Sequence, residues 1–435
     1  MNLLTFKGGV HPKEEKFHTA DKVIREMPRP TKVVIPLRQH IGAPCELNVA
    51  KGDEVKTGQV VGSSPAYVCA NIHATISGKV VDIASMPHPV LGSCLSVIIE
   101  SDNEDKWVEV EHYRDWEHLT KEKLRMIIKE AGIVGLGGVV FPTHVKLSPP
   151  EDKSIDTVIL NGAECEPYLT SDQRIMVERA KDITQGLKII MKVLSAKKAF
   201  IAGEINKPSA LSLMAKATKA EKDIEVVPLK TKYPQGSEKQ LIKAVLNREV
   251  PSGGLPLDVG VVVQNVGTAL AIMEAVVLGK PLIDRTVTVT GLAVKEPQNL
   301  RVRIGTLFQD VIDACGGFDK EPGKIIMGGP MMGIAQKSTD VPVIKGTSGI
   351  LVLPKKEVKL INPKDCIRCG RCIEVCPMRL MPNMLGILVE RARWEEAKKY
   401  HLLDCIECGS CGYVCPSNRS LVHFIKLGKF KISKK

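Results

Sequence analysis

Aromatic residues are scarce in this sequence. Phe, Trp and Tyr together make up 4% of its 435 residues, too few for the base-stacking platforms of proteins that bind single-stranded nucleic acid, so we expect no nucleic-acid partner. Long apolar runs are also lacking. The most apolar stretch, residues 259–277, contains two amide side chains and a glutamate, whereas a membrane-spanning helix needs about 20 predominantly apolar residues. The opening MNLLTFKGGVHPKEEKFH has no apolar core and predicts no signal peptide.

The remaining composition is that of an ordinary globular protein. Hydrophobic residues make up 44% and charged residues 25%, and the length predicts about two to four domains. The net charge is +12, and it is unevenly distributed. Residues 416–435 contain six lysines and arginines and no acid. This basic tail fits contact with anionic lipid headgroups or with an acidic partner, and it fits a plain solvated end equally well.

Two cysteine runs near the C-terminus carry the strongest chemical signal. Eight of the 13 cysteines lie in them, and both runs read C-x2-C-x2-C-x3-C-P. In such a run the first three thiolates bind one iron–sulfur cluster, and the fourth, after a short helical turn, points to the other cluster. The sequence therefore predicts two [4Fe–4S] clusters with crossed ligation, one on Cys366, Cys369, Cys372 and Cys415, the other on Cys376, Cys405, Cys408 and Cys411.

A pair of structural zinc sites is the alternative interpretation of these runs. Zinc favours two C-x2-C knuckles separated by a longer loop, which would leave the third and fourth cysteines of each run without a role. We therefore favour iron–sulfur clusters. Between the runs, Met384, Leu385, Leu388 and Ala392 predict one amphipathic helix of roughly four turns.

Residues 31–105 predict a compact β unit, because short β-prone runs alternate with Gly and Pro turns. Two phrases, Val49–Gln59 and His73–Val80, are similar to the half-repeats of biotinyl and lipoyl barrel-sandwich domains. Those carriers present a modified lysine in the hairpin between the phrases. The corresponding stretch here, Ser64–Asn71, contains no lysine, so we interpret the unit as a docking or structural domain rather than a carrier.

An open α/β domain follows, and two of its segments have the character of a ligand site. A helix capped by Thr120 leads into a loop with four glycines in residues 132–138, whose backbone N–H groups can surround an anion or a flat ring. Lys146 could then face a phosphate. The strand Thr157–Leu160 opens onto Asn161-Gly-Ala-Glu-Cys-Glu-Pro-Tyr, at the position where α/β sheets bind ligands. Cys165, between two carboxylates, is interpreted as packing rather than as a nucleophile.

These residues together resemble the RnfC family, the C subunits of the Rnf complex, and, more distantly, the NADH-binding flavoprotein of respiratory complex I. The resemblance is carried by Thr5–Pro12, Pro36–Ala43, the glycine loop, Asn161–Tyr168 and both cysteine runs. It implies an FMN between the glycine loop and the end of the Asn161 strand, with NADH stacking over it. The flavin is the redox group, and no side chain acts as a catalytic acid or base.

Residues of the flavin and nucleotide sites carry over from the resemblance one by one. Those matching the flavin pattern are Gly135, Gly137, Gly138, Lys146, Asn161 and Glu164, with Asn265 and Thr268 near the phosphate. Glu166 and Glu238 match acids that contact the nicotinamide nucleotide. The chain departs from the complex I pattern at Ala163, Leu147, Ser237 and Val140, which affects the nucleotide site more than the flavin site.

The predicted organisation is a multidomain α/β-plus-β protein. It comprises an N-terminal arm (1–30), a lipoyl-like barrel-sandwich domain (31–105), an α/β domain for FMN and NADH (106–280), a soluble-ligand-binding β-grasp domain (281–350) and a helical two-cluster ferredoxin-like domain with the basic tail (351–435).

The resemblance implies a peripheral subunit on the cytoplasmic side of the cell membrane. It would exchange electrons between NAD(H) and the clusters, with membrane and ferredoxin-like Rnf subunits as partners, in a complex that couples ferredoxin oxidation to Na⁺ or H⁺ translocation. Two alternatives are a soluble flavin and iron–sulfur corrinoid reductase and a non-enzymatic electron relay. The coupling ion, the direction of electron flow and the cluster next to the flavin stay open.

Overall fold

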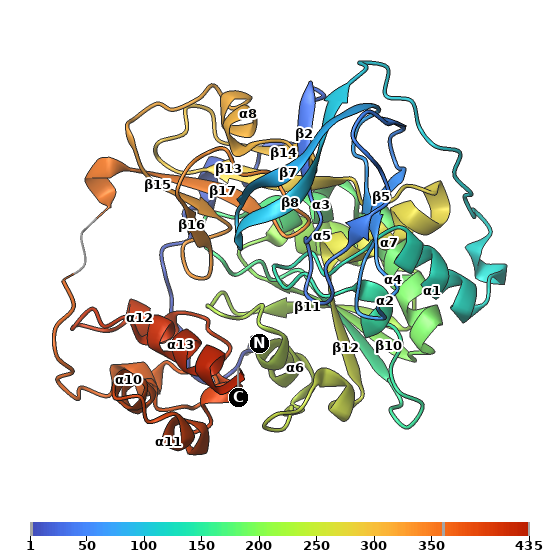
Figure 1. Ribbon diagram of the computed structural model, residues 1–435. Coiled ribbons are helices and arrows are strands. Elements are labelled where there is room, and N and C mark those ends of the chain that lie inside the picture. The colour runs from blue at the N-terminus through green and yellow to red at the C-terminus, as the bar shows by residue number, and fades with distance from the viewer. Residues whose placement is uncertain (1–2, 359–361, 434–435) are drawn as a thin grey trace.

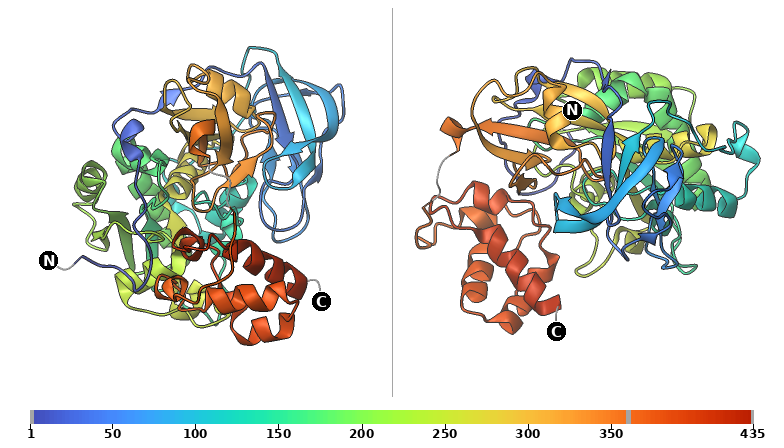
Figure 2. Two further views of the ribbon diagram at one scale, coloured as in Figure 1. Left: turned by 90° about the vertical axis from the view of Figure 1, so that its left-hand side faces the viewer. Right: turned by 45° about the horizontal axis from the view of Figure 1, so that its top comes forward.

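A computed structural model of the chain describes residues 3–358 and 362–433. It contains four packed units, which follow one another along the chain from blue to red in Figure 1. A β unit near the N-terminus, a central α/β unit and a mixed β-sheet lie against one another. A helical unit at the C-terminus packs beside helix α6 (Glu238–Leu246) of the α/β unit (Figures 1 and 2). Within the described ranges, no helix combines the length and apolar character needed to cross a bilayer.

The N-terminal β unit consists of two small sheets around one apolar core. One sheet has the order β2-β8-β7-β4 and the other β3-β5-β6. Their strands are β2 (Lys32–Pro36), β3 (Glu46–Leu47), β4 (Glu54–Val55), β5 (Val60–Ser63), β6 (Ile72–His73), β7 (Gly78–His88) and β8 (Gly92–Ser101). Buried β-branched residues such as Val33, Ile35, Val97 and Ile99 fill the space between the sheets, because alternate residues of each strand face inward. The predicted barrel-sandwich character is confirmed.

The central unit is a four-stranded parallel sheet in the order β11-β10-β9-β12. Its strands are β9 (Thr157–Asn161), β10 (Lys198–Glu204), β11 (Ile224–Leu229) and β12 (Val261–Asn265), and its main helices are α1 (Lys121–Glu130), α3 (Ser171–Glu178), α4 (Ala180–Leu194), α5 (Pro208–Ala217), α6 (Glu238–Leu246) and α7 (Val266–Leu278). The sheet interior is almost continuously apolar, which is typical of a parallel sheet covered on both faces. Thr120 caps α1 as predicted, by accepting a hydrogen bond from Lys123 N.

The third unit is a six-stranded mixed sheet in the order β1-β14-β13-β17-β15-β16. It contains β1 (Arg25–Glu26), β13 (Asp284–Thr290), β14 (Gln298–Arg303), β15 (Pro322–Met327), β16 (Ile334–Gln336), β17 (Gly349–Pro354) and helix α8 (Phe308–Asp313). We predicted that this domain ends at residue 350. Strand β17 extends past that residue, so the sheet continues to Pro354. Cys315 is fully buried in its core, as its position on an apolar helix face predicted.

The C-terminal helical unit differs from the prediction between the cysteine runs. Two helices stand there, α10 (Pro382–Glu390) and α11 (Trp394–Lys399), where we predicted one. Ala392 has a φ of 52°, and Arg393 N donates to Leu388 O and Ala392 N to Val389 O. This bonding pattern satisfies the last carbonyls of a helix and ends it. The break lets α10 and α11 fold back onto α13 (Leu421–Ser433).

The basic tail is built into this helical unit. Its Arg419 forms an ion pair with Glu390, and Lys426 and Lys429 both reach the carboxylate of Glu407, Lys429 at 2.8 Å. Three of the six tail cations therefore have partners inside the unit. Lys434 and Lys435 lie outside the described residues.

The N-terminal arm links three of the four units. Leu4 forms a bridge to Leu229, the last residue of β11, and Val10 forms one to Tyr233 beyond it. Gly9 N donates to Val375 O in the helical unit. Farther along, β1 pairs in parallel with β14 of the mixed sheet. The arm therefore adds backbone pairing at the edges of two sheets and reaches the cysteine-rich unit as well.

Candidate electron-transfer site

The carboxyl ends of β9 and β12 define the point where the chain reverses its order across the parallel sheet. Strands β9, β10 and β11 are laid down in one direction, and β12 then returns to the other side of β9. Asn161 and Asn265, the last residues of β9 and β12, are register partners there. Open α/β sheets bind ligands in the crevice beyond the carboxyl ends of their strands at such a switch point.

The glycine loop lies over this switch point. Leu136 N donates to Thr268 Oγ1 at 2.9 Å, and a Cβ on Gly137 would lie 3.4 Å from the Cβ of Asn265. Gly138 has a φ of 101°, which only glycine adopts easily, and a Cβ there would meet nothing within 4 Å. Gly137 and Gly138 are exposed. They thus offer backbone N–H groups to a ligand that approaches closely.

Gly135 and the two strand-end asparagines support the loops around the site. Gly135 N donates to Phe141 O and closes the glycine loop. The Asn161 amide donates to Gly236 O at 2.7 Å and accepts from Ala163 N. The Asn265 side chain accepts from Gly267 N and caps α7. The N-terminus of α7, a favourable position for an anion, therefore lies next to Gly137.

Glu164 caps the start of α3. Its carboxylate accepts from Ser171 Oγ, Asp172 N and Gln173 N, at 2.8 to 3.2 Å. Asp172 in turn accepts from Asn265 Nδ2 at 2.6 Å. Burial and the neighbouring Glu164 carboxylate raise the pKa of Asp172 to about 7, against the hydrogen bond from Asn265. The site therefore contains a carboxyl group that titrates near neutral pH.

Lys146 and Glu238 form an ion pair of 2.5 Å at the rim of the site. Lys146 belongs to the short helix α2 (Thr143–Lys146), and Glu238 begins α6. About a third of each side chain is exposed (29% and 36%), so a ligand can reach both. The pair joins two segments 92 residues apart.

Glu166 contacts the mixed sheet in the structure. Its carboxylate accepts from Met331 N at 3.0 Å and from Met332 N at 2.8 Å, in the turn between β15 and β16. Burial raises the pKa of Glu166, and these two hydrogen bonds lower it. Burial, followed by the Glu204 carboxylate, raises the pKa of Cys165 to about 12, which agrees with a packing role.

The eight clustered cysteines form two groups in the structure. Cys366, Cys369, Cys372 and Cys415 line one hollow, which we call the outer set. Cys376, Cys405, Cys408 and Cys411 line another, which we call the inner set. Each group combines three cysteines of one run with the fourth of the other run, as the crossed pattern requires. Gly370 and Gly409, with φ of 79° and 84°, turn the chain just before the third cysteine of each run.

The inner set is the one that faces the α/β unit. Tyr233 Oη donates to Cys408 O at 2.6 Å, and Gln240 Nε2 donates to Pro377 O at 3.3 Å. Tyr233, Cys165, Met331 and Cys408 belong to one apolar cluster. In the outer set Cys369 is exposed, and the neighbouring Ile367 is 68% exposed. The two sets thus lie at different depths, one at the interface and one toward solvent.

Three residues that organise the site were missed by sequence reasoning. Lys16 lies buried beneath the loop after β9, and its ammonium donates to the carbonyls of Glu164, Glu166 and Leu169 at 2.5 to 2.9 Å. Asp172 and Tyr233 are the other two. Lys16 is about 150 residues from its partners, and a lysine in a charged N-terminal stretch carries no signal for such burial. Asp172 could have been found from its place in the first turn of a helix beside Glu164.

A parallel sheet with a glycine loop at its switch point, docked on a unit with two four-thiol sets, defines a class of proteins. It is the class that joins a nucleotide-type cofactor site to a pair of iron–sulfur clusters. Comparison with known families agrees unit by unit. Residues 4–104 match the RnfC barrel sandwich hybrid domain, 128–274 the Nuo51 FMN-binding domain, 286–335 the SLBB domain and 358–416 the 4Fe-4S dicluster domain.

Whole-chain comparison identifies the family. The chain is 56% identical over 98% of its length to the C subunit of the proton-translocating ferredoxin:NAD(+) oxidoreductase complex of Clostridium ljungdahlii, covering 93% of that protein. It is 49% identical to the C subunit of the Na(+)-translocating complex of Acetobacterium woodii (98% and 97% covered) and 43% identical to that of the ion-translocating oxidoreductase complex of Rhodobacter capsulatus (100% and 84% covered). The chain belongs to this family of Rnf complex C subunits, and FMN and [4Fe–4S] clusters are its cofactors.

A solved structure shares part of the fold. The match is to a chain of an NAD+-reducing [NiFe]-hydrogenase in the air-oxidized state, with a TM-score of 0.50 and 18% identity over 68% of this chain and 60% of that one.

Proposed function

We propose that this chain exchanges electrons between NAD(H) and two [4Fe–4S] clusters through an FMN bound at the β9–β12 switch point. It would do so within a complex that couples ferredoxin:NAD⁺ oxidoreduction to ion translocation, the activity named for its relatives. The observation that carries the proposal is the contact between the inner cysteine set and Tyr233, because a cluster bound by that set would lie at the domain that contains the glycine loop. Electrons then need to cross only one interface within the chain.

The residues around the switch point fit a flavin. Gly138 leaves open space where a side chain would stand, and Gly137 lies exposed against Asn265. The N-terminus of α7 favours a phosphate, and Lys146 offers a cation at the rim. FMN, when bound, converts the two-electron chemistry of a nicotinamide into the one-electron chemistry of the clusters. We assign the direct contacts to Gly137, Gly138 and Lys146. Gly135, Asn161, Glu164, Asn265 and Thr268 would hold the surrounding loops in place.

We assign the nicotinamide nucleotide to the rim, where Glu238 lies beside Lys146. Glu238 is partly exposed and can accept hydrogen bonds from ribose hydroxyls once the ion pair opens. Glu166 would position the loop after β9 rather than contact the nucleotide, because its carboxylate already accepts two backbone hydrogen bonds from the mixed sheet.

We assign one cluster to each cysteine set and infer their order. The inner set contacts the α/β unit through Tyr233 and Gln240, so its cluster would exchange electrons with the flavin. The outer set includes the exposed Cys369, so its cluster would exchange electrons with another protein of the complex. Burial raises the pKa of Cys405 to about 11 while Lys429 lowers it, so cluster assembly there must release protons.

The other Rnf subunits are the partners we propose, with the chain peripheral on the cytoplasmic side of the membrane. The mixed sheet with α8 packed on it fits a β-grasp arrangement, and we place its end after Pro354, where β17 ends. We keep the predicted domain boundaries at residue 30 for the arm, residue 105 for the barrel-sandwich unit and residue 280 for the α/β unit.

Anaerobic purification tests this function directly. Iron, sulfide and flavin are quantified, NADH is then added, and absorbance is followed in the flavin and cluster bands. About eight irons and one FMN per chain, with both chromophores bleached by NADH, is the expected result. Clusters without flavin, not reduced by NADH even after FMN is restored, would indicate an electron relay. Purification without any membrane protein, together with reduction of a corrinoid protein, would indicate the corrinoid reductase alternative.

A further inference from the structure

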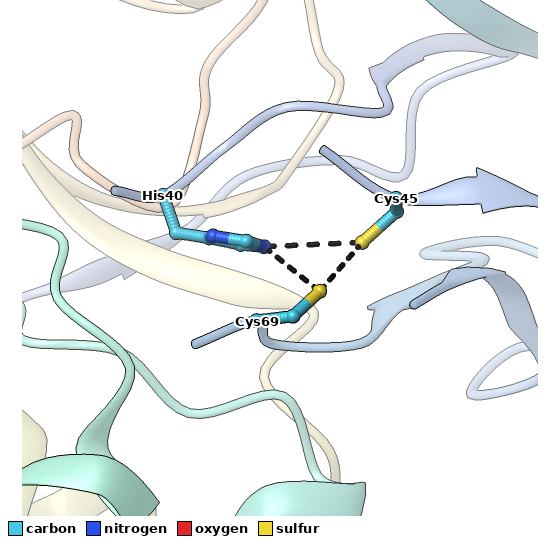
Figure 3. Close-up of side chains that lie close together, drawn as sticks. All are labelled: His40, Cys45 and Cys69. Atoms are coloured by element: carbon cyan, nitrogen blue, oxygen red, sulfur yellow. Dashed lines mark hydrogen bonds between the residues drawn. The ribbon is translucent and has the colours of Figure 1, made fainter. Parts of the chain in front are cut away.

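Three metal-ligand side chains meet inside the barrel-sandwich unit, far along the chain from the iron–sulfur cysteines. His40, Cys45 and Cys69 are all buried, and their ligand atoms point toward one another (Figure 3). The Cys45 and Cys69 sulfurs lie 3.4 Å apart, and His40 Nε2 lies 3.8 Å from Cys45 Sγ and 3.6 Å from Cys69 Sγ. The three atoms thus form a nearly equilateral triangle.

This triangle has the dimensions of one face of a tetrahedral zinc site. With Zn–S of about 2.3 Å and Zn–N of about 2.05 Å, tetrahedral geometry places two sulfurs about 3.8 Å apart and a sulfur about 3.6 Å from a nitrogen. A disulfide, in contrast, requires an S–S distance of about 2.05 Å. We propose that His40, Cys45 and Cys69 bind one zinc ion, at a site separate from both clusters.

The surroundings of the histidine fit this role. His40 Nδ1 lies 3.3 Å from its acceptor, Ile41 O, and a hydrogen bond at Nδ1 leaves the lone pair on Nε2 for a metal, as in most zinc-bound histidines. Ala70 N also donates to Nε2, at 3.1 Å, and the metal would replace this bond. The Ala70 carbonyl oxygen lies 3.5 Å from Cys45 Sγ, at a suitable separation for a fourth ligand.

A buried lysine lies beside the segments that carry His40 and Cys69. Lys345 is 1% exposed, and its ammonium donates to Asn71 O and Gly132 O at 2.6 Å each. No carboxylate pairs with Lys345 in the part of the chain that the structure describes. Two thiolates and a dication together are neutral, so the buried ammonium of Lys345 brings the net charge of the junction to about +1.

The zinc would lock the two loops by which the barrel-sandwich unit contacts the α/β unit. The loop before Cys45 donates from Ile41 N to Val140 O in the glycine loop. The loop before Cys69 accepts, at Tyr67 O, from His144 Nε2 at 3.0 Å. Zinc ligated from both loops would fix these contacts relative to each other. The site is therefore structural, at the junction with the proposed flavin loop.

The test measures zinc and iron separately in the full-length holoprotein, purified anaerobically and then dialysed after incubation with Zn²⁺ alone. We expect about one zinc per chain beside about eight irons. X-ray absorption at the zinc edge, to which iron is invisible, should show two sulfur ligands at about 2.3 Å. Zinc below a tenth of an equivalent, or a shell of oxygen and nitrogen only, would overturn the proposal, the latter as adventitious zinc.

Variants locate the site and check the alternative of a disulfide. Cys69→Ser and His40→Gln should each lose at least ten-fold in zinc affinity while iron and flavin stay unchanged. Cys94→Ser, in β8 of the same unit, is the matched control and should keep its zinc. Zinc retained at full affinity in Cys69→Ser overturns the site. If that variant fails to fold, alkylation of the anaerobic wild type decides, because a Cys45–Cys69 disulfide found there excludes the zinc site.

Discussion

Single side chains at the switch point divide into those that face a ligand and those that hold loops. Gly137, Gly138 and Lys146 are available to a ligand, whereas Asn161 and Glu164 have their polar atoms bonded to backbone. The sequence placed all of them at the glycine loop and the strand end, because such segments have strong local signatures. It could not separate the two roles, since the direction of a side chain depends on hydrogen bonds to residues far along the chain.

Lys146 gives the first prediction at this scale. Lys146→Ala removes the cation at the rim of the proposed flavin site, so FMN occupancy of the purified protein should fall several-fold while iron stays unchanged. Flavin released by acid and iron are measured in the same sample. Lys153→Ala is the control, because Lys153 pairs with Asp258 in the same α/β unit and should not alter flavin content. Unchanged flavin in Lys146→Ala would place the FMN site elsewhere.

Asp172 gives a prediction about pH. Its pKa in the folded chain, about 7, lies above the value of about 3.9 in an unfolded chain. The unfolded state therefore releases this proton first, and the wild type loses stability as pH rises from about 4 through about 7. Asp172→Asn cannot ionise and keeps an acceptor for Asn265. We expect the difference in apparent Tm between Asp172→Asn and the wild type to be a few degrees larger at pH 8 than at pH 5. Thermal scans at one heating rate measure it. An equal difference at both pH values would contradict this.

At the scale of elements, the order of the parallel strands is what creates the site. Because β12 returns beside β9, Asn161 and Asn265 become neighbours although they are far apart in sequence. The strands themselves were predictable from their apolar runs. The break between α10 and α11 was not, because Ala392 normally favours a helix and adopts a positive φ only through the hydrogen bonds that close α10.

The segment between β11 and α6 carries a prediction about electron transfer. Tyr233→Phe removes the hydrogen bond to Cys408 O, worth about 1 kcal/mol, and loosens the contact between the inner set and the α/β unit. Flavin reduction by NADH should proceed at the wild-type rate, and cluster reduction should slow several-fold. Stopped-flow absorbance at the two bands separates the steps. Slowing of both steps alike would mean that Tyr233 acts on the flavin site instead.

At the scale of the whole molecule, the arm is the segment that sequence reasoning described least. The sequence predicted only an N-terminal arm without contacts, yet its residues pair with the β11 edge, reach Val375 and bury Lys16 under the loop after β9. Such long-range pairing leaves no local pattern, because each contact depends on where the other units lie.

Gly9 tests the arm as a connector between units. A Cβ there would lie 2.6 Å from Tyr233 O, at a φ of 83°, so Gly9→Ala should detach the arm from Tyr233 and from the helical unit. We expect slower cluster reduction by NADH, with flavin reduction preserved. Gly52→Ala is the control, since Gly52 has a φ of 102° and open space around it. Equal effects of the two changes would mean that only backbone strain matters.

The loop Ser64–Asn71 occupies the place where carrier domains present a lysine that travels between distant active sites. Here Tyr67 accepts from His144, and Asn71 accepts from a buried lysine, so the tip is anchored at both ends. The barrel-sandwich unit, of a type that elsewhere carries a bound group between active sites, is thereby fixed against the rest of the chain. Movement of this unit therefore has no part in the proposed electron path, which runs from the switch point to the inner cysteine set.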